Sequence, residues 1–338
     1  MSRIGEFELI ARLVEMVAEA RLDRTSEWGA RIVVASGDDA AVTVPKGATA
    51  TSVDSLVEGI HFRRQTAPLG SVGRKALASA LSDLAAMGAA PGEAYVQLGV
   101  PDDLGEADCL ELGRGLAQEA AEHDVAVLGG DVTRAPTLWI AITVVGHADS
   151  AGELVRRAGA GPGDHLAVTG ELGGAAAGLL LLDRPELATV VEAEVADALR
   201  RRQLEPQPRL AAGRALAAAG ASAMIDLSDG LGGDAAHIAT ASGVRLVIEL
   251  ERLPIQAGVG EVAAAAGVDA FDLAAGRGED YELLVALPPD RAEDARAEVT
   301  ATGLTLTSIG VAEEGAGAAL RASDGSERPL AGFDQLRR

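Results

Sequence analysis

The sequence predicts a protein of two α/β domains, and three observations lead to this fold class. The chain has 338 residues, which is more than one hydrophobic core usually organises. Segments with apolar residues at helical spacing alternate with short β-branched runs along the chain. A Gly/Pro-rich stretch, GELVRRAGAGPGDHL, interrupts this alternation at 152–166. We therefore expect an N-terminal α/β domain over residues 1–150 and a C-terminal α/β domain over residues 151–338.

Periodicity places the elements of the first half and gives its second helix a buried leucine stripe. The expected helices cover 6–21, 71–87 and 105–122, and the expected strands cover 31–35, 41–44, 48–53, 93–100, 125–129 and 138–147. The stripe consists of Leu77, Leu81, Leu84 and Gly88, which recur at three to four residues. Strands near 48–53 and 137–146 are candidates for sheet edges that contact a second subunit.

The second half shows the same alternation. The expected helices cover 173–182, 188–200, 208–219, 232–241 and 290–299, and the expected strands cover 222–228, 244–250, 281–287 and 306–312. Residues 312–330 are expected to form a late hairpin or loop. The sequence has no repeat at a fixed period of roughly 20–50 residues, which excludes solenoids and propellers.

The composition is that of a soluble protein of the reducing cytoplasm. Hydrophobic residues make up 48% of the chain, but no apolar run reaches membrane-spanning length. The N-terminus lacks the apolar block of a secretory signal, and the single cysteine, Cys109, allows no internal disulfide. A formal charge of −22 argues against nucleic-acid binding. If phosphates bind this chain, divalent cations would have to mediate the contact.

Carboxylates recur beside glycines or after apolar runs at distant places in the chain. The clusters are GDDAA (Asp38, Asp39), SVDSLVEGIHF (Asp54, His61), SDLAAMGA (Asp83), LGGDVTR (Asp131), IDLSDGLGGD (Asp226, Asp229, Asp234) and GRGEDYELL (Glu279, Asp280). A single aspartate of this kind is more often a helix cap or an Asx turn. Their recurrence where α/β proteins place ligand-binding loops favours a metal site.

Asp83 is the hardest of these aspartates to explain by structure alone. It falls inside the expected helix 71–87, where aspartate has poor propensity and an unpaired buried charge is costly. A bound cation would remove that cost. Oxygen ligands favour Mg²⁺ or Ca²⁺, because the close Cys and His spacing of zinc sites is absent from the sequence. Mg²⁺ is the usual ion of nucleotide-dependent phosphoryl transfer.

Several common catalytic motifs are absent from the sequence. It has no P-loop, no protein-kinase HRD or DFG set, no G-x-G-x-x-G and no G-x-S-x-G elbow. Phosphates would therefore be neutralised by metal ions, by backbone N–H groups in glycine-rich turns and by arginines such as Arg134 or Arg157.

Taken in order, the motifs between residues 37 and 284 resemble the thiamine-monophosphate kinase family of the aminoimidazole ribonucleotide synthetase superfamily. GDDAAV, DSLVEGIHF, KALASALSDLAAMGA, LGGDVTR, RAGAGPGD, DLSDGL and GEDYELL carry the resemblance, and GFDQL near the C-terminus also fits. The resemblance implies ATP-dependent phosphorylation of thiamine monophosphate with several Mg²⁺ ions. It also implies a cytoplasmic homodimer whose N-terminal strands form the interface, with no nucleic-acid or membrane partner.

The resemblance further implies a role for each matching position. Metal would be bound by Asp39, Ser52, Asp54, Asp83, Asp131, Asp226 and Asp229; ATP by Gly130, Asp131, Arg157 and Ser228; and the substrate by His61, Glu279 and Phe333. Two places depart from the family. Val53 stands before Asp54 where the family often has a hydroxyl residue, and the helix near Leu112 and Gly113 lacks an aromatic residue beside the nucleotide.

The expected chemistry is direct in-line phosphoryl transfer, with no covalent intermediate and no general base. The acceptor phosphate oxygen is already ionised near neutral pH, so the difficulty lies in bringing two anions together. Metal ions on converging aspartates would neutralise both anions and position them. His61, between Ile60 and Phe62, is as compatible with packing as with substrate contact.

Two alternatives fit parts of the sequence. Another ATP-dependent enzyme of the superfamily, such as a purine-pathway synthetase, fits on fold alone. Selenophosphate synthetase would have a reactive Cys near its start, whereas Cys109 lies in mid-chain, and the hydrogenase-maturation relative would end in Cys, whereas this chain ends QLRR. A non-catalytic acidic Mg²⁺- or Ca²⁺-binding protein is the second alternative. Carboxylate clusters in both halves speak against it, because they suggest one cleft.

Overall fold

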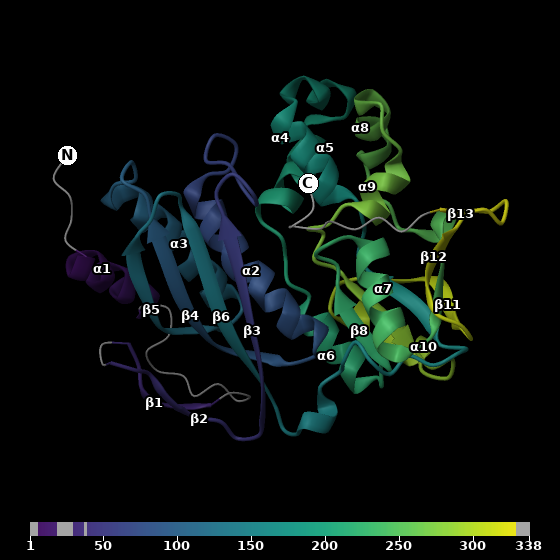
Figure 1. The fold of residues 1–338 in the computed structure, drawn as a ribbon, viewed down its shortest axis with the longest axis horizontal. Coiled ribbons are helices and arrows are strands. Elements are labelled where there is room, and N and C mark those ends of the chain that lie inside the picture. The colour runs from purple at the N-terminus through teal and green to yellow at the C-terminus, as the bar shows by residue number, and fades with distance from the viewer. Residues whose placement is uncertain (1–5, 19–29, 37–38, 329–338) are drawn as a thin grey trace. The chain divides into compact units, whose positions relative to one another are not determined.

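The computed structural model describes residues 6–18, 30–36 and 39–328 (Figure 1). The chain divides into two compact units. The first unit comprises Met1–Leu84 and Ala89–Ala151, and the second comprises Ala85–Gly88 and Gly152–Arg338. Each unit packs helices against its own sheet, which confirms the α/β fold class predicted from the sequence.

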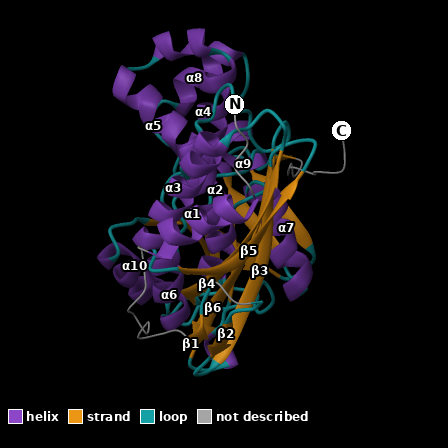
Figure 2. Ribbon diagram, turned by 90° about the vertical axis from the view of Figure 1, so that its left-hand side faces the viewer, coloured by secondary structure: helices purple, strands orange, loops and turns teal. Residues whose placement is uncertain are grey.

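The first unit is built around a four-stranded sheet of order β3-β6-β4-β5. Its elements are α1 (Glu6–Ala18), β1 (Arg31–Val34), β2 (Val42–Val44), β3 (Ala48–Val57), α2 (Leu69–Ala86), β4 (Ala90–Val100), α3 (Glu106–Glu122), β5 (Ala126–Arg134) and β6 (Trp139–Ala148). β4 and β5 are parallel and α3 connects them, whereas β6 is antiparallel to both of its neighbours. Figure 2 shows α2 and α3 on the same side of this sheet. β1 and β2 form a separate antiparallel pair.

The leucine stripe of α2 faces the core, as the sequence predicts. Leu77 and Leu81 are fully buried, and Leu84 is almost so. A Cβ atom on Gly73 would lie 2.1 Å from the carbonyl oxygen of Leu112, so the glycine at this position is what lets α2 approach α3 closely. Cys109 is buried in α3, and burial raises the pKa of its thiol.

One expectation about the sheet edges is wrong. The strands at the two edges are β3 and β5, so the segment 48–53 does lie in an edge strand. The segment 137–146 falls largely in β6, which lies inside the sheet between β3 and β4. Periodicity fails here because it detects a strand but carries no information about the order of strands in the sheet.

The second unit has a seven-stranded sheet of order β13-β12-β9-β11-β7-β10-β8. Its elements are β7 (His165–Thr169), α4 (Gly174–Asp183), α5 (Ala193–Leu204), α6 (Leu210–Ala218), β8 (Ala223–Asp226), α7 (Leu231–Ser242), β9 (Arg245–Glu249), α8 (Val259–Ala266), α9 (Ala270–Gly276), β10 (Leu283–Leu287), α10 (Ala292–Ala301), β11 (Leu306–Glu313), β12 (Gly317–Arg321) and β13 (Glu327–Arg328). One core joins the sheet to α7 and α9, and a second core lies among α4, α5, α8 and α9.

Several boundaries in the second unit differ from the prediction. The expected helix 188–200 is split into a 3₁₀ helix at Pro185–Val190 and α5, because the chain is extended at Val191 and Glu192. α8 and α9 were not predicted. The late hairpin is confirmed, since β12 and β13 pair antiparallel. Among the described residues, no helix is long and apolar enough to cross a membrane.

Candidate functional site

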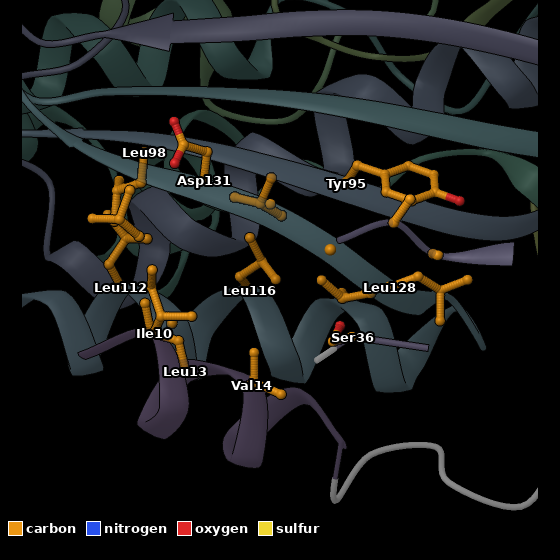
Figure 3. A pocket seen from close by; sticks show the side chains of 18 of the residues that line it. Ile10, Leu13, Val14, Ser36, Tyr95, Leu98, Leu112, Leu116, Leu128 and Asp131 are labelled. Carbon is orange, nitrogen blue, oxygen red and sulfur yellow. The ribbon is translucent and has the colours of Figure 1, made fainter. Parts of the chain in front are cut away.

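A pocket of about 580 Å³ lies along the open edge of β5 in the first unit (Figure 3). Its lining includes Gly130 and Asp131 of β5, which are the residues predicted to bind ATP, and Asp39, which is a predicted metal ligand. The second aspartate of GDDAA therefore lies at the same pocket as LGGDVTR, although the two motifs are far apart in sequence. Its neighbour Asp38 lies outside the described residues.

The rest of the pocket is mainly aliphatic. α1 contributes Ile10, Leu13 and Val14, and α3 contributes Leu112 and Leu116. In Figure 3, Tyr95 lies at the end of the pocket away from Leu98 and Leu112. The lining therefore combines aliphatic side chains with the carboxylates of Asp39 and Asp131.

A second group of predicted residues lies at the opposite edge, on β3. Ser52 donates a hydrogen bond to the Asp83 carboxylate of α2, so the helical aspartate that sequence reasoning singled out faces this strand. Asp54 follows on the same side of β3 and accepts a 2.7 Å hydrogen bond from its own neighbour's amide, Ser55 N–H. The structure thus brings together two of the predicted metal ligands, Ser52 and Asp83, and places Asp54 on the same face of β3 as Ser52.

His61 lies just after β3 in a tight turn. Its Nδ1 accepts a 3.0 Å hydrogen bond from the amide of Val57. This contact makes Nδ1 an acceptor, so a neutral ring carries its proton on Nε2 and can donate from that atom. The side chain is half-buried. The Nδ1 atom of His61 is therefore used in a hydrogen bond within the fold, whereas Nε2 can donate to a ligand.

The first unit does not gather its predicted ligands in one cavity. Asp39 and Asp131 lie at the β5 edge, whereas Ser52, Asp54 and Asp83 lie at the β3 edge. Two strands separate β3 from β5, which places the two backbones about 14 Å apart at the usual strand spacing. Asp54 and Asp131 also lie inside their strands, not after them, which the sequence reasoning did not foresee.

In the second unit, the motifs DLSDGL and GEDYELL lie side by side. β8 pairs with β10, and beyond the strands Tyr281 N–H donates to the carbonyl of Leu227 while Glu279 N–H donates to the carbonyl of Ser228. Glu279 has a φ of 70° and Tyr281 a φ of 50°, which is a conformation that non-glycine residues rarely adopt. The hydrogen bonds hold this turn against Ser228, so the structure brings a predicted ATP residue beside a predicted substrate residue.

The carboxylate of Glu279 is also held. Gln203 of α5, a buried residue, donates a 2.5 Å hydrogen bond from its side-chain amide to Glu279 Oε2. Sequence reasoning missed Gln203, and its position in a charged helix carries no pattern that would have indicated it.

Near the end of β8, three potential metal ligands come together. Asp229, Asp234 and His237 each offer one ligand atom, and these atoms lie within 4.8 Å of one another. Asp234 is in the first turn of α7, with its carboxylate accepting a 3.2 Å hydrogen bond from Asp229 N–H. Only Asp229 was predicted as a ligand. The signal for the others was the i, i+3 spacing of Asp234 and His237, which places both on one helix face.

The electrostatics of this group indicate crowded negative charge. Burial raises the pKa of Asp234 to about 8, and the nearby charges of Asp226 and Asp229 add to the effect. Asp226 is itself buried at the end of β8. A divalent cation is the natural counter-charge for such a set, and oxygen atoms are the ligands that hard cations prefer.

The same unit contains buried carboxylates with protein partners. Glu282 is fully buried and accepts two hydrogen bonds from Arg209, at 2.8 and 2.6 Å, one from Arg202 at 2.9 Å and one from Thr169 at 2.7 Å. Asp280 accepts bonds from the amides of Gly173 and Ala175 at the start of α4, while burial raises its pKa to about 6. We interpret these two residues as structural.

The remaining predicted residues are less informative. Arg157 is exposed, and its backbone carbonyl accepts a 3.2 Å hydrogen bond from Ser242. Phe333 lies outside the described residues.

Comparison with known proteins first identifies the protein family of the two domains. Residues 37–148 match the AIR synthase related protein N-terminal domain, and residues 161–323 match the AIR synthase related protein C-terminal domain. These two domains in tandem account for most of both units described above.

Individual relatives narrow the class. The thiamine-monophosphate kinase of Escherichia coli K12 is 39% identical over 286 residues, covering 84% of this chain and 83% of that protein. That of Mycobacterium tuberculosis H37Rv is 37% identical over 286 residues, covering 84% and 81%. The chain therefore belongs to the AIR synthase related family and, within it, to the thiamine-monophosphate kinases.

Solved structures agree with this assignment. A thiamine-monophosphate kinase from Stenotrophomonas maltophilia K279a is 34% identical, with a TM-score of 0.82 over 94% of this chain and 96% of that one. A structure described as AaThiL complexed with AMPPCP and TMP is 28% identical, with a TM-score of 0.73 over 98% of each chain.

Proposed function

We propose that this chain transfers the γ-phosphoryl group of ATP to thiamine monophosphate, forming thiamine diphosphate and ADP. The observation that carries the proposal is the β5-edge pocket, where Gly130, Asp131 and Asp39 line one cavity beside an aliphatic slot. The likeness to a relative described as complexed with AMPPCP and TMP over 98% of both chains supports the same two substrates.

The metal is expected to be Mg²⁺, and the residues present fit such an ion. In the second unit, Asp226 and Asp229 add negative charge beside Asp234, whose pKa burial raises to about 8. In the first unit, Asp39 and Asp131 form one candidate group, and Ser52, Asp54 and Asp83 form another. Two groups within one unit are consistent with several ions. When bound, Mg²⁺ would neutralise phosphate oxygens and lower the repulsion between the two anions.

The chain's own residues would act mainly by binding and orientation. Gly130 has to be a glycine because a Cβ there would lie 2.0 Å from Val96 O of the neighbouring strand β4, and its backbone would lie against the ligand. His61 would donate from Nε2 to a phosphate oxygen of the acceptor. Glu279 is oriented by Gln203. Its carboxylate would accept a hydrogen bond from the amino group of the thiamine pyrimidine or lie beside the cationic thiazolium ring. No side chain is required to form a covalent phosphoryl intermediate or to remove a proton, because the acceptor oxygen is already ionised.

A coupled ADP-release assay tests the proposal. The acceptors are free thiamine, thiamine monophosphate and a purine-pathway ribonucleotide, each with Mg²⁺ and with EDTA. We expect ADP release with thiamine monophosphate and Mg²⁺, and none with EDTA. Turnover with the ribonucleotide alone would assign the chain to another reaction of the superfamily. Thermal stabilisation by Mg²⁺ with no further gain from AMPPCP or thiamine monophosphate would favour a cation-binding protein.

A homodimer in the cytoplasm completes the proposal. On edge strand β3, Thr49, Thr51, Val53 and Ser55 are exposed on one side, and Val53 is 65% exposed. An exposed sheet face of this kind is a typical site of association between chains. Light scattering of the purified protein should give twice the mass of one chain, and a monomer mass at micromolar concentration would contradict the dimer.

A further inference from the structure

We propose that Ser242, the last residue of α7, is a positioning residue for nucleotide binding, because its hydroxyl fixes the loop that carries Arg157. Arg157 is one of the residues predicted to bind ATP, and it lies in the glycine-rich segment 156–164. The inference rests on the proposed function, which it deepens by naming a residue that acts on the nucleotide phosphates through Arg157.

The Ser242 hydroxyl makes three hydrogen bonds to this loop. It donates to the carbonyl of Arg157 at 3.2 Å and accepts from the amides of Gly159 and Ala160, each at 3.1 Å. A hydroxyl has one hydrogen and two lone pairs, so these three contacts use its whole hydrogen-bonding capacity. Ser242 therefore acts on the loop and does not bind a ligand itself.

The loop's amides are also used within the protein. The N–H of Gly161 donates to a carboxylate of the same loop at 2.9 Å, and the N–H of Gly163 donates to a carbonyl of β11 at 2.8 Å. Together with the two amides that Ser242 holds, these groups are not available to phosphate oxygens. The loop's contribution to phosphate binding therefore comes from its cationic side chains, and the exposed Arg157 is the predicted one.

The loop is anchored on both sides of Arg157 by contacts that do not involve Ser242. On one side, the carbonyl of Arg156 accepts a 3.1 Å hydrogen bond from the amide of Met224 in β8. On the other side, Ala160 is 5% exposed and belongs to the core between the sheet and α7. Loss of the Ser242 hydroxyl would therefore free only the short stretch around Arg157 and leave the fold of the unit intact.

The path of the loop beside Ser242 also requires a glycine. Gly159 has a φ of 138°, and a Cβ there would lie 2.2 Å from the carbonyl oxygen of Ser222. The loop backbone thus lies directly on the segment before β8 while the amide of Gly159 reaches the Ser242 hydroxyl. The shape of the loop is fixed before any nucleotide binds, which lowers the ordering cost of binding.

Titration calorimetry of the full chain with AMPPCP and Mg²⁺ tests the inference. Ser242→Ala should raise the Kd for AMPPCP about fivefold to tenfold, because the backbone around Arg157 is no longer held. The KM for thiamine monophosphate, measured at saturating ATP, should stay within about twofold. A general loss of structure would instead weaken both substrates.

A double-mutant cycle with Arg157→Met determines whether Ser242 acts through Arg157. Arg157→Met alone should raise the Kd for AMPPCP at least about tenfold, because a charge-assisted hydrogen bond to phosphate is lost. Adding Ser242→Ala to Arg157→Met should change the Kd by less than about twofold, since the loop then has no guanidinium to position.

Thr302→Ala is the matched control. The hydroxyl of Thr302, at the C-terminal end of α10, donates a 2.7 Å hydrogen bond to the carbonyl of Val299 in its own helix. The variant therefore removes a hydroxyl from the end of another helix of the same unit, and it should leave the Kd for AMPPCP within about twofold of the wild type.

Three results would overturn the inference: an unchanged Kd in Ser242→Ala, an equal loss in Thr302→Ala, or a full additional loss when Ser242→Ala is added to Arg157→Met. ADP release by the wild type with thiamine monophosphate is scored separately. No release would contradict the proposed function, whereas normal release together with an unchanged Kd in Ser242→Ala would contradict only the role of Ser242.

Discussion

Two buried carboxylates of the second unit differ in how their charge is compensated. Glu282 is 0% exposed and Asp234 is 2% exposed, so both are removed from water. Glu282 is surrounded by Arg202, Arg209 and Thr169, which donate to both of its oxygens. Asp234 instead has Asp226 and Asp229 as its charged neighbours, and its pKa is raised to about 8.

The difference separates a structural charge from a functional one. A buried ion pair with complete hydrogen bonding belongs to the fold, and removing one partner leaves an uncompensated charge. Carboxylates of like charge gathered around a buried carboxylate are an arrangement that a bound cation would compensate. Substitution, metal and pH should therefore affect the group around Glu282 and the group around Asp234 in opposite ways.

The largest effect is expected in the group of Asp226, Asp229 and Asp234. Asp229→Asn should lower kcat with thiamine monophosphate by a factor on the order of 10³, because a ligand to the metal ion is lost. The free energy of unfolding without metal should not fall, since one of the crowded charges is removed. The exposed Asp290→Asn serves as control. Activity within a few fold of the wild type would remove Asp229 from the metal site.

A change beside Glu282 should instead lower the free energy of unfolding. Arg209→Met removes the bidentate partner of Glu282 and should lower the free energy of unfolding by about 3–5 kcal/mol, measured by urea denaturation. Mg²⁺ should not restore it. Adding Glu282→Gln to Arg209→Met should recover part of the loss. A loss below about 1 kcal/mol would mean that the Arg209 pair is not what balances the buried charge.

Mg²⁺ affinity should depend on pH through Asp234. Because the metal-free group is protonated below pH of about 8, the ion must displace a proton there. The Kd for Mg²⁺, measured by calorimetry, should rise by up to about tenfold for each unit of pH below 8 and level off above it. A Kd that is constant between pH 6 and 8 would place the ion away from Asp234.

The smallest effect is on metal-free stability. The raised pKa means that the native state holds a proton that the unfolded chain, with an ordinary pKa of 3.8, has released. The stability of the wild type is therefore lost progressively as pH rises from about 4 to about 8. In EDTA, Asp234→Asn should be more stable than the wild type at pH 8 and should gain almost nothing at pH 4. Equal stabilisation at both pH values would contradict a titrating Asp234.

Sequence reasoning succeeded where a pattern is local. The α2 stripe belongs to this class, because apolar periodicity is written in neighbouring residues. α8 and α9 were not predicted because they have only 8 and 7 residues, too few to show a repeated apolar period.

The sequence does not reveal the order of the strands in the sheet or which distant residues lie near one another. The position of β6 inside the sheet, and the separation of Asp54 from Asp131 at opposite edges, depend on tertiary pairing. Gln203 and the α1 residues at the pocket carry no chemical signature in the sequence. Their roles follow only from the residues that they contact.

The packing of α1 beside β5 and α3 also bears on how the molecule is made. α1 ends at Ala18, whereas β5 ends only at Arg134. Contacts between such distant parts of a chain form late, since closure of a long loop must come first. During synthesis the apolar side of α1 therefore stays without its β5 contact until more than a hundred further residues have been made.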